Sequence, residues 1–138
     1  MKTGIVIDTG PLVAAFDRSD ARSSETIEQF KTIQSPILTC EAVLAETWYL
    51  LRNYPPGWEK VENWIESGIL QVSFSLATQR ERIFVLLRKF RDLPMSLADA
   101  CLVAMIEQGI GSRVFTFDRH FQIYRHSGRR VVPLLLPS

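Results

Sequence analysis

The stretch that decides the fold is "GIVIDTGP", residues 4–11. Its first half is a short run of β-branched residues that ends in an acid, Asp8, and such a run favours a buried strand. Its second half has the chemistry of a helix start, because Thr9 can cap a helix and Pro11 suits a first turn. The stretch therefore predicts a strand that feeds directly into a helix, with Asp8 at the junction.

The rest of the chain continues this alternation of strand and helix. Further strands are predicted at residues 36–39, 69–74, 113–118 and 130–136. Helices are predicted at residues 23–32, 41–52, 58–66, 78–91 and 94–109. The sequence Pro55-Pro56-Gly57 is expected to stop one helix before the next begins at Trp58. Five strands separated by helices predict a parallel sheet covered on both faces, a three-layer α/β/α fold.

Length and composition favour one folded domain over residues 1–138. Charged residues make up 22% of the chain and hydrophobic residues 46%, which excludes a disordered protein. No apolar run approaches the roughly 20 residues that span a bilayer, and the N-terminal stretch has no small-residue cleavage site. We therefore expect a cytoplasmic protein without a membrane segment. Cys40 and Cys101 have no CxxC spacing, so they are expected in the core rather than in redox chemistry.

The net charge of +1 argues against indiscriminate binding to nucleic acid, but the charges are unevenly distributed. Residues 113–130 contain five arginines and a single acid, whereas residues 41–66 contain five glutamates and only Arg52 and Lys60 as cations. Such segregation permits a polyanionic partner without requiring one.

Acidic side chains stand where a parallel sheet gathers its functional residues. Asp8 and Asp118 each end a predicted strand, and the carboxyl ends of parallel strands open at one crevice. Glu46 shares a helical face with the apolar Val43 and Leu50, which predicts an inward-facing acid. The alternatives are that the two aspartates only cap helices and that Glu46 is an ion-paired structural residue.

Asp99 has a structural explanation of its own. The sequence "SLAD", residues 96–99, is a capping box in which Ser96 caps a helix and Asp99 occupies its third position. A capping box alone would explain the acid. However, Leu102, Val103 and Ile106 continue its helical face, so Asp99 is expected to point toward the core or the crevice.

Four acids at one crevice require compensation of their charge. Two carboxylates about 5 Å apart repel by roughly 3 kcal/mol at an effective dielectric constant near 20, so the cluster needs protons or a cation. Oxygen ligands suit Mg²⁺ or Mn²⁺, and zinc is disfavoured because His120 and His126 have no partners at ligand spacing. Thr116 lies on the same strand face as Asp118, where it either supports the site or is simply a good strand former.

Four segments in order carry a family resemblance: "IVIDTGPLVAAFD", "EAVLAETWYLL", "DLPMSLADACLVAMIE" and "VFTFDRHF". With them the chain resembles PIN-domain ribonucleases, particularly VapC-type toxins of type II toxin-antitoxin systems. The resemblance implies a sheet of order 3-2-1-4-5 and Mg²⁺- or Mn²⁺-dependent endonuclease activity on RNA. It also implies that Asp8, Asp99 and Asp118 hold the metal, while Glu46 orients or deprotonates the attacking water.

One position departs from the family pattern. Many relatives carry an acid where this chain has Ser96, so we expect one bound metal rather than two. The resemblance further implies a homodimer and a small antitoxin that binds along a hydrophobic groove. Aromatic residues that either line such an interface or fill the core are Trp48, Tyr49, Tyr54, Trp58 and Trp64. Arginines that either contact RNA phosphates or are simply solvated are Arg119, Arg125, Arg129 and Arg130.

Three other functions stay open at this point. The chain fits a PIN scaffold that binds RNA or a protein without cleaving, or a solitary nuclease without an antitoxin. A phosphohydrolase with Asp8 as nucleophile is disfavoured, because the haloacid dehalogenase-like pattern would want an aspartate where Gly10 stands.

Overall fold

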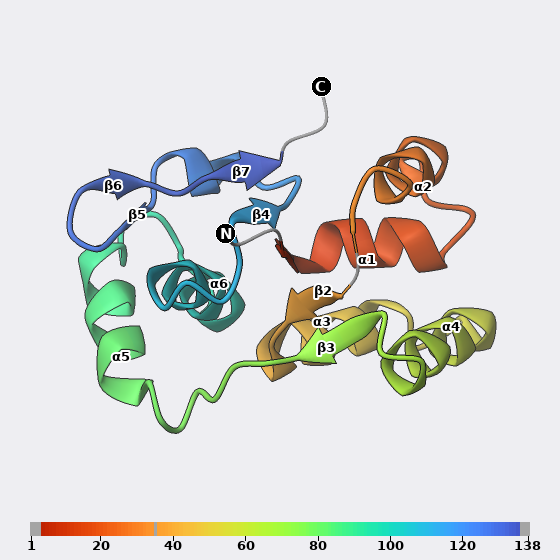
Figure 1. Cartoon of the computed structure of the whole chain (residues 1–138), viewed down its shortest axis with the longest axis horizontal. Coiled ribbons are helices and arrows are strands. Elements are labelled where there is room, and N and C mark those ends of the chain that lie inside the picture. The colour runs from red at the N-terminus through yellow and green to blue at the C-terminus, as the bar shows by residue number, and fades with distance from the viewer. Residues whose placement is uncertain (1–3, 35, 136–138) are drawn as a thin grey trace.

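The computed structural model describes residues 4–34 and 36–135. At its centre five parallel strands lie in the order β3-β2-β1-β4-β7 (Figure 1). They are β1 (Ile5–Ile7), β2 (Ile37–Thr39), β3 (Leu70–Val72), β4 (Arg113–Phe115) and β7 (Leu134–Leu135). The predicted order 3-2-1-4-5 is confirmed, with β7 as the fifth strand along the chain to enter this sheet.

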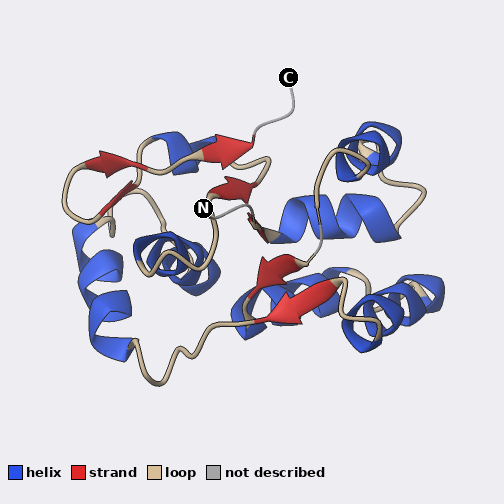
Figure 2. Ribbon diagram, in the orientation of Figure 1, coloured by secondary structure: helices blue, strands red, loops and turns tan. Residues whose placement is uncertain are grey.

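Helices cover both faces of the sheet, as the three-layer prediction requires. They are α1 (Thr9–Phe16), α2 (Ser23–Phe30), α3 (Glu41–Leu50), α4 (Pro55–Glu66), α5 (Arg80–Lys89) and α6 (Leu97–Glu107). In Figure 1, α5 and α6 lie to the left of the strands, and α1, α2 and α4 lie to the right. Colouring by secondary structure shows the same alternation of helix and strand along the chain (Figure 2).

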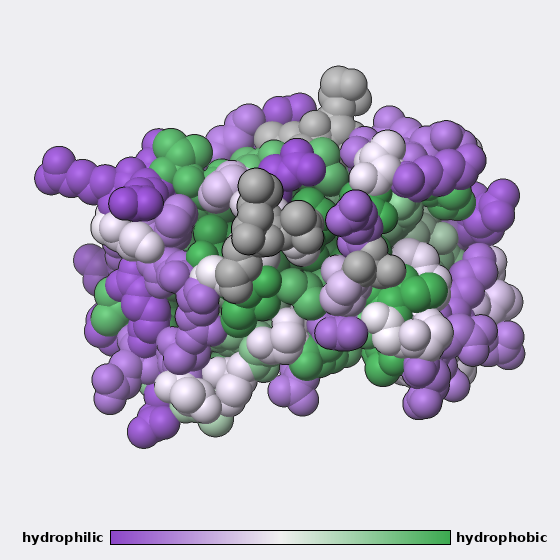
Figure 3. Space-filling view, in the orientation of Figure 1, coloured by the Kyte–Doolittle hydropathy of each residue, from purple (hydrophilic) through white to green (hydrophobic). Residues whose placement is uncertain are grey.

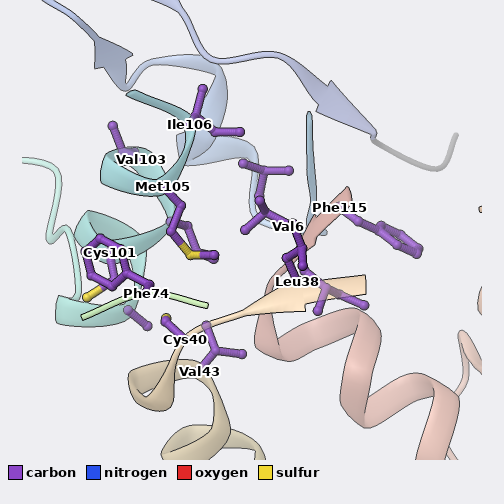
Figure 4. Close-up of a cluster of buried hydrophobic side chains, with 14 of the residues drawn as sticks. Val6, Leu38, Cys40, Val43, Phe74, Cys101, Val103, Met105, Ile106 and Phe115 are labelled. Carbon is purple, nitrogen blue, oxygen red and sulfur yellow. The ribbon is translucent and has the colours of Figure 1, made fainter. Parts of the chain in front are cut away.

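The central strand β1 and the helix α6 form the middle of the core. In β1, Ile5 pairs with Ile37 on one side and Arg113 on the other, and all three β1 residues are buried. Every residue of α6 from Ala98 to Ile106 is buried, which explains why its sequence is apolar on all sides. Figure 4 shows side chains of α6 packed beside Val6 of β1.

The start of α4 differs from the prediction. The preceding helix does end before Pro55, as predicted, but the next helix begins at Pro55 and not at Trp58. Proline is tolerated in the first turn because its missing N–H would have no partner in the helix there. The prolines therefore mark the beginning of α4 rather than a gap before it.

The last predicted strand, residues 130–136, is divided in two. Its first part, β6 (Arg130–Val131), pairs antiparallel with β5 (Arg125–His126) in a separate hairpin, and only β7 joins the main sheet. Ser127 and Gly128, at the hairpin turn, both have positive φ, as a tight primed turn requires. Leu136, the last residue of the predicted strand, lies outside the described residues.

Aromatic residues divide between core and surface. Trp64 packs edge-on against Phe16 and Phe30, and Trp58 donates a hydrogen bond to the carbonyl of Leu51. Trp48 and Tyr49 are exposed on α3. Tyr54 is half-buried against the core. The tryptophans and tyrosines of α3 and α4 therefore serve both as core residues and as exposed apolar surface.

Polar residues dominate the perimeter of the face shown in Figure 3, while hydrophobic ones gather toward its middle. Within the described part of the chain, no helix combines the length and the apolar character needed to span a bilayer. Cys40 and Cys101 are both buried free thiols, as predicted for core residues.

Candidate active site

Two strand ends place the first pair of acids. Asp8 follows β1 directly, and its N–H donates to the carbonyl of Phe115, the last residue of β4, at 3.0 Å. Asp118 lies three residues beyond β4 and caps a short 3₁₀ helix, η1 (Arg119–Gln122). The parallel pairing of β1 with β4 therefore brings both acids to the same carboxyl edge of the sheet.

Asp8 is the most deeply buried of the four acids. Its Oδ1 accepts the N–H of Thr9 at 2.7 Å, and its Oδ2 accepts the hydroxyl of Thr116 at 2.7 Å. Burial nevertheless raises the pKa of Asp8 to about 6, and the charges of Asp99 and Glu46 add to the rise. Near neutral pH, a carboxyl group with this pKa can lose its proton when a cation binds.

Asp99 combines the two roles that its sequence left open. The capping box is present, because Asp99 accepts the N–H of Ser96 at 3.2 Å and its own N–H donates to Ser96 Oγ at 3.0 Å. Its Oδ2 also accepts the hydroxyl of Tyr124 at 3.0 Å. Burial raises the pKa of Asp99, and the charge of Asp118 raises it further. Asp99 is thus a helix cap that also belongs to the cluster of acids.

Asp118 is tied to its neighbours on both sides. Its Oδ1 accepts the N–H of His120 at 2.9 Å and lies 3.1 Å from Nδ1 of the same residue. Its own N–H donates to Thr116 Oγ1 at 2.9 Å. Since Thr116 also donates to Asp8, one buried hydroxyl links the acids that follow β1 and β4.

Glu46 lies on a different helical face from the one predicted. The sequence predicted an inward-facing acid beside Val43 and Leu50, but Glu46 and Leu50 are exposed, and Val43 and Thr47 are the buried residues of α3. The side chain of Glu46 still belongs to the cluster, because its Oε2 accepts the hydroxyl of Thr9 at 3.1 Å. It therefore approaches Asp8 from the solvent side.

The oxygen atoms of this cluster match the chemistry of a hard divalent cation. Within the described residues, Asp99 Oδ1 and Asp118 Oδ2 accept no hydrogen bond, and each oxygen of Asp8 accepts only one. Among the same residues, no three His, Cys, Asp or Glu side chains are grouped so that they could hold a metal ion by themselves. Mg²⁺ is typically held by one or two carboxylates with water and substrate phosphate, so this donor set fits it.

The predicted arginines lie in different places relative to the acids. Arg119 is exposed next to Asp118. Arg125 donates to the carbonyls of residues 122, 123 and 124, which makes it a structural residue. Arg129 and Arg130 belong to the hairpin, whose Ser127 N–H donates to the Glu107 side chain at the opposite end of α6 from Asp99. The structure therefore does not bring the hairpin arginines to the acids.

Two residues that contact the acids were not predicted. Tyr124 is fully buried, and burial together with the nearby carboxylates raises its pKa, so its hydroxyl stays a proton donor to Asp99. His120 contacts Asp118. No sequence motif marks either residue. His120 lies within η1 and Tyr124 lies two residues after its end, so the fold of this turn brings each residue to its acid.

Replacing Thr116 by valine is expected to lower the free energy of unfolding by about 1–3 kcal/mol, because Asp8 and the Asp118 N–H lose a buried partner. The loss should be larger at pH 7.5 than at pH 5, since the hydroxyl holds down the pKa of Asp8. Thr47→Val is a matched control, because the Thr47 hydroxyl bonds only the Val43 carbonyl. Urea unfolding at both pH values measures the difference. Equal pH dependence in the two variants would contradict a linking role for Thr116.

A family model and a solved structure match the chain. The model for the PIN domain matches residues 5–126, so the chain belongs to the PIN-domain family. The structure is that of VapC20 from Mycobacterium tuberculosis, described as a toxin that cleaves the sarcin-ricin loop. It aligns with a TM-score of 0.73 at 21% identity, over 83% of this chain and 90% of that one. This structural similarity shows that the two proteins share a fold. No curated protein sequence matches the chain.

Proposed function

We propose that this chain is a metal-dependent endoribonuclease that hydrolyses phosphodiester bonds in RNA. The observation that carries the proposal is the set of acids joined at one sheet edge: Thr116 links Asp8 to the Asp118 N–H, Thr9 links Asp8 to Glu46, and the charge of Asp99 helps to raise the pKa of Asp8. Membership of the PIN-domain family supports the same reaction class. Asp8, Glu46, Asp99 and Asp118 are the catalytic acids in this proposal.

Each acid has a role that follows from its surroundings. Asp8, Asp99 and Asp118 would hold one Mg²⁺ or Mn²⁺ ion, partly through water molecules, and the ion would supply charge to offset the scissile phosphate and lower the pKa of a water molecule. The hydroxyl of Thr116 fixes the orientation of Asp8, and that of Tyr124 fixes Asp99. Glu46 is exposed and anchored by Thr9, so it orients the attacking water or accepts its proton.

The biological setting follows from the likeness to VapC20. We infer that the chain is one PIN domain over residues 1–138, acts in the cytoplasm as a toxin, and is silenced by a small antitoxin. We also infer a homodimer, supported by exposed apolar side chains on α3 and α5. These are Trp48, Tyr49, Leu50, Phe84 and Val85.

The ends of the RNA products test the reaction. Because the attacking group is water and the leaving group is O3′, cleavage should produce a 3′-hydroxyl and a 5′-phosphate. Labelled single-stranded RNA would be incubated with the protein and Mn²⁺ or Mg²⁺, with chelator as the control, and the ends identified by ligation and phosphatase treatment. Products that end in a 2′,3′-cyclic phosphate would indicate attack by the RNA's own 2′-hydroxyl and contradict the proposal. RNA that binds but stays intact with either metal would instead favour a non-cleaving PIN scaffold.

A further inference from the structure

An aromatic side chain stands between the two acid-linked residues of the β4–η1 connection. Phe117 lies in the chain between Thr116, which donates to Asp8, and Asp118, a proposed metal ligand. Phe117 also packs against Gly10, two residues after Asp8, where an added Cβ would lie 3.0 Å from the ring atom Cδ2. The ring is therefore fixed between the segments that follow β1 and β4.

Arg22 lies over this ring. Its guanidinium carbon is 4.3 Å from the centroid of Phe117, the geometry of a cation–π contact. Arg22 is the residue immediately before α2, and its N–H donates to Asp20 Oδ1, which holds the backbone in place. A cation from a different segment of the chain is thus held on the aromatic side chain of the residue that precedes Asp118.

The charge of Arg22 is available to a ligand. Within the described residues its guanidinium forms no salt bridge and no hydrogen bond, and the residue is exposed. By contrast, Arg82 binds the Glu107 carboxylate through two nitrogens, and Arg52 and Arg80 donate to backbone carbonyls. Arg22 is positioned by packing while its hydrogen-bond donors remain free.

We propose that Arg22, stacked on Phe117, binds a phosphodiester group of the RNA. This group is the neighbour, along the same strand, of the phosphodiester that reaches the acids. This inference rests on the proposed ribonuclease function. Four carboxylates at one edge repel a polyanion, so a fixed cation stacked on the residue before Asp118 favours the approach of the strand. The planar guanidinium suits a phosphate group because it presents two parallel N–H donors, and stacking on an aromatic ring leaves those donors free.

Binding of single-stranded RNA at several salt concentrations tests the proposal. The measurements use the Asp8→Asn variant, so that RNA is not cut, with and without Arg22→Ala. Loss of a charged hydrogen-bonding contact should lower affinity about tenfold. Loss of one phosphate contact should reduce the slope of log affinity against log salt by about 0.7. Arg22→Lys should keep most of the slope but lose affinity, because an ammonium group lacks the planar fork.

Arg18→Ala is the matched control, because Arg18 is also exposed in the connection between α1 and α2. It should leave both affinity and slope unchanged. Phe117→Leu keeps an apolar contact with Gly10 but removes the aromatic ring on which Arg22 stacks. It should therefore lower the affinity for RNA, whereas Arg18→Ala should not. Thermal unfolding of each variant checks that it is folded.

The outcomes separate this inference from the proposed function. If the Asp8→Asn protein binds RNA and Arg22→Ala behaves like Arg18→Ala, the Arg22 inference is overturned while the ribonuclease proposal stands. If the Arg22-dependent slope is present but the unsubstituted protein cuts no RNA with Mg²⁺ or Mn²⁺, the phosphate site stands and the ribonuclease proposal falls. If the Asp8→Asn protein binds no RNA at any salt concentration, the Arg22 inference is overturned, and cleavage by the unsubstituted protein decides the ribonuclease proposal.

Discussion

Replacing Asp8 by asparagine is expected to lower the rate of RNA cleavage at least a hundredfold and leave the protein folded. The side chain keeps its size and its acceptor for the Thr9 N–H, but it loses the charge that a cation requires. Loss of one charge-stabilising group in an active site typically costs about 10²–10³ in rate. The measurement is single-turnover cleavage of labelled RNA with Mn²⁺ in excess.

Asp92→Asn provides the matched control for this experiment. Asp92 is exposed in the turn between α5 and α6, so the same change of chemistry occurs away from the acids. Its cleavage rate should equal that of the unsubstituted chain. Undiminished cleavage by the Asp8→Asn protein would show that the reaction does not use this cluster.

The stability of the protein is expected to depend on pH and on divalent metal through the same residue. Burial raises the pKa of Asp8 from its ordinary value near 4 to about 6. The folded state therefore binds this proton more tightly than the unfolded state. Protonated Asp8 therefore contributes about 3 kcal/mol to the free energy of unfolding. This contribution is fully present below pH 4 and is lost as the pH rises through 6.

A bound cation should recover stability above pH 6, where Asp8 is ionised. At ten times the dissociation constant, Mg²⁺ or Mn²⁺ should add about 1.4 kcal/mol, which corresponds to a rise of about 4 °C in Tm. The same metal at pH 4.5 should have a much smaller effect because protons compete for the carboxyl group. Calorimetry at the two pH values, with and without metal, measures both effects.

The Asp8→Asn protein is the control for the pH and metal dependence. It should be more stable than the unsubstituted chain at pH 7.5 without metal, because it buries no charge at position 8. It should also gain less from added metal. If added metal raises the Tm equally in both proteins, the cation binds at a site that does not include Asp8.

Local rules predicted most of the fold because several of them agree at the same positions. At β1 and α1, the β-branched run and the first-turn proline indicate one junction, although its N-cap is Asp8, one of the two alternatives for that acid, and not Thr9. They failed where position in the tertiary structure decides the outcome. The helix α4 begins at Pro55 and not at Trp58, and residues 130–135 divide between a hairpin and the main sheet.

The candidate site was predictable only in part for a similar reason. The capping box and the strand ends mark Asp99, Asp8 and Asp118 within short windows of sequence. The face of Glu46 was wrong because α3 carries apolar residues on its exposed side as well, so hydrophobic spacing does not define its orientation. The stacking of Arg22 on Phe117 joins segments far apart in the chain, and no local pattern records it.

One segment, residues 124–127, is fastened to both ends of α6. Tyr124 donates to Asp99 in the first turn of the helix, and the N–H of Ser127 donates to Glu107, its last residue. Eight residues of helix rise about 12 Å and three peptide units reach at most about 11 Å, and the side chains of Tyr124, Asp99 and Glu107 supply the remaining reach. The same short segment therefore restrains both termini of the helix that carries Asp99, so an insertion within residues 124–127 is expected to detach one of them.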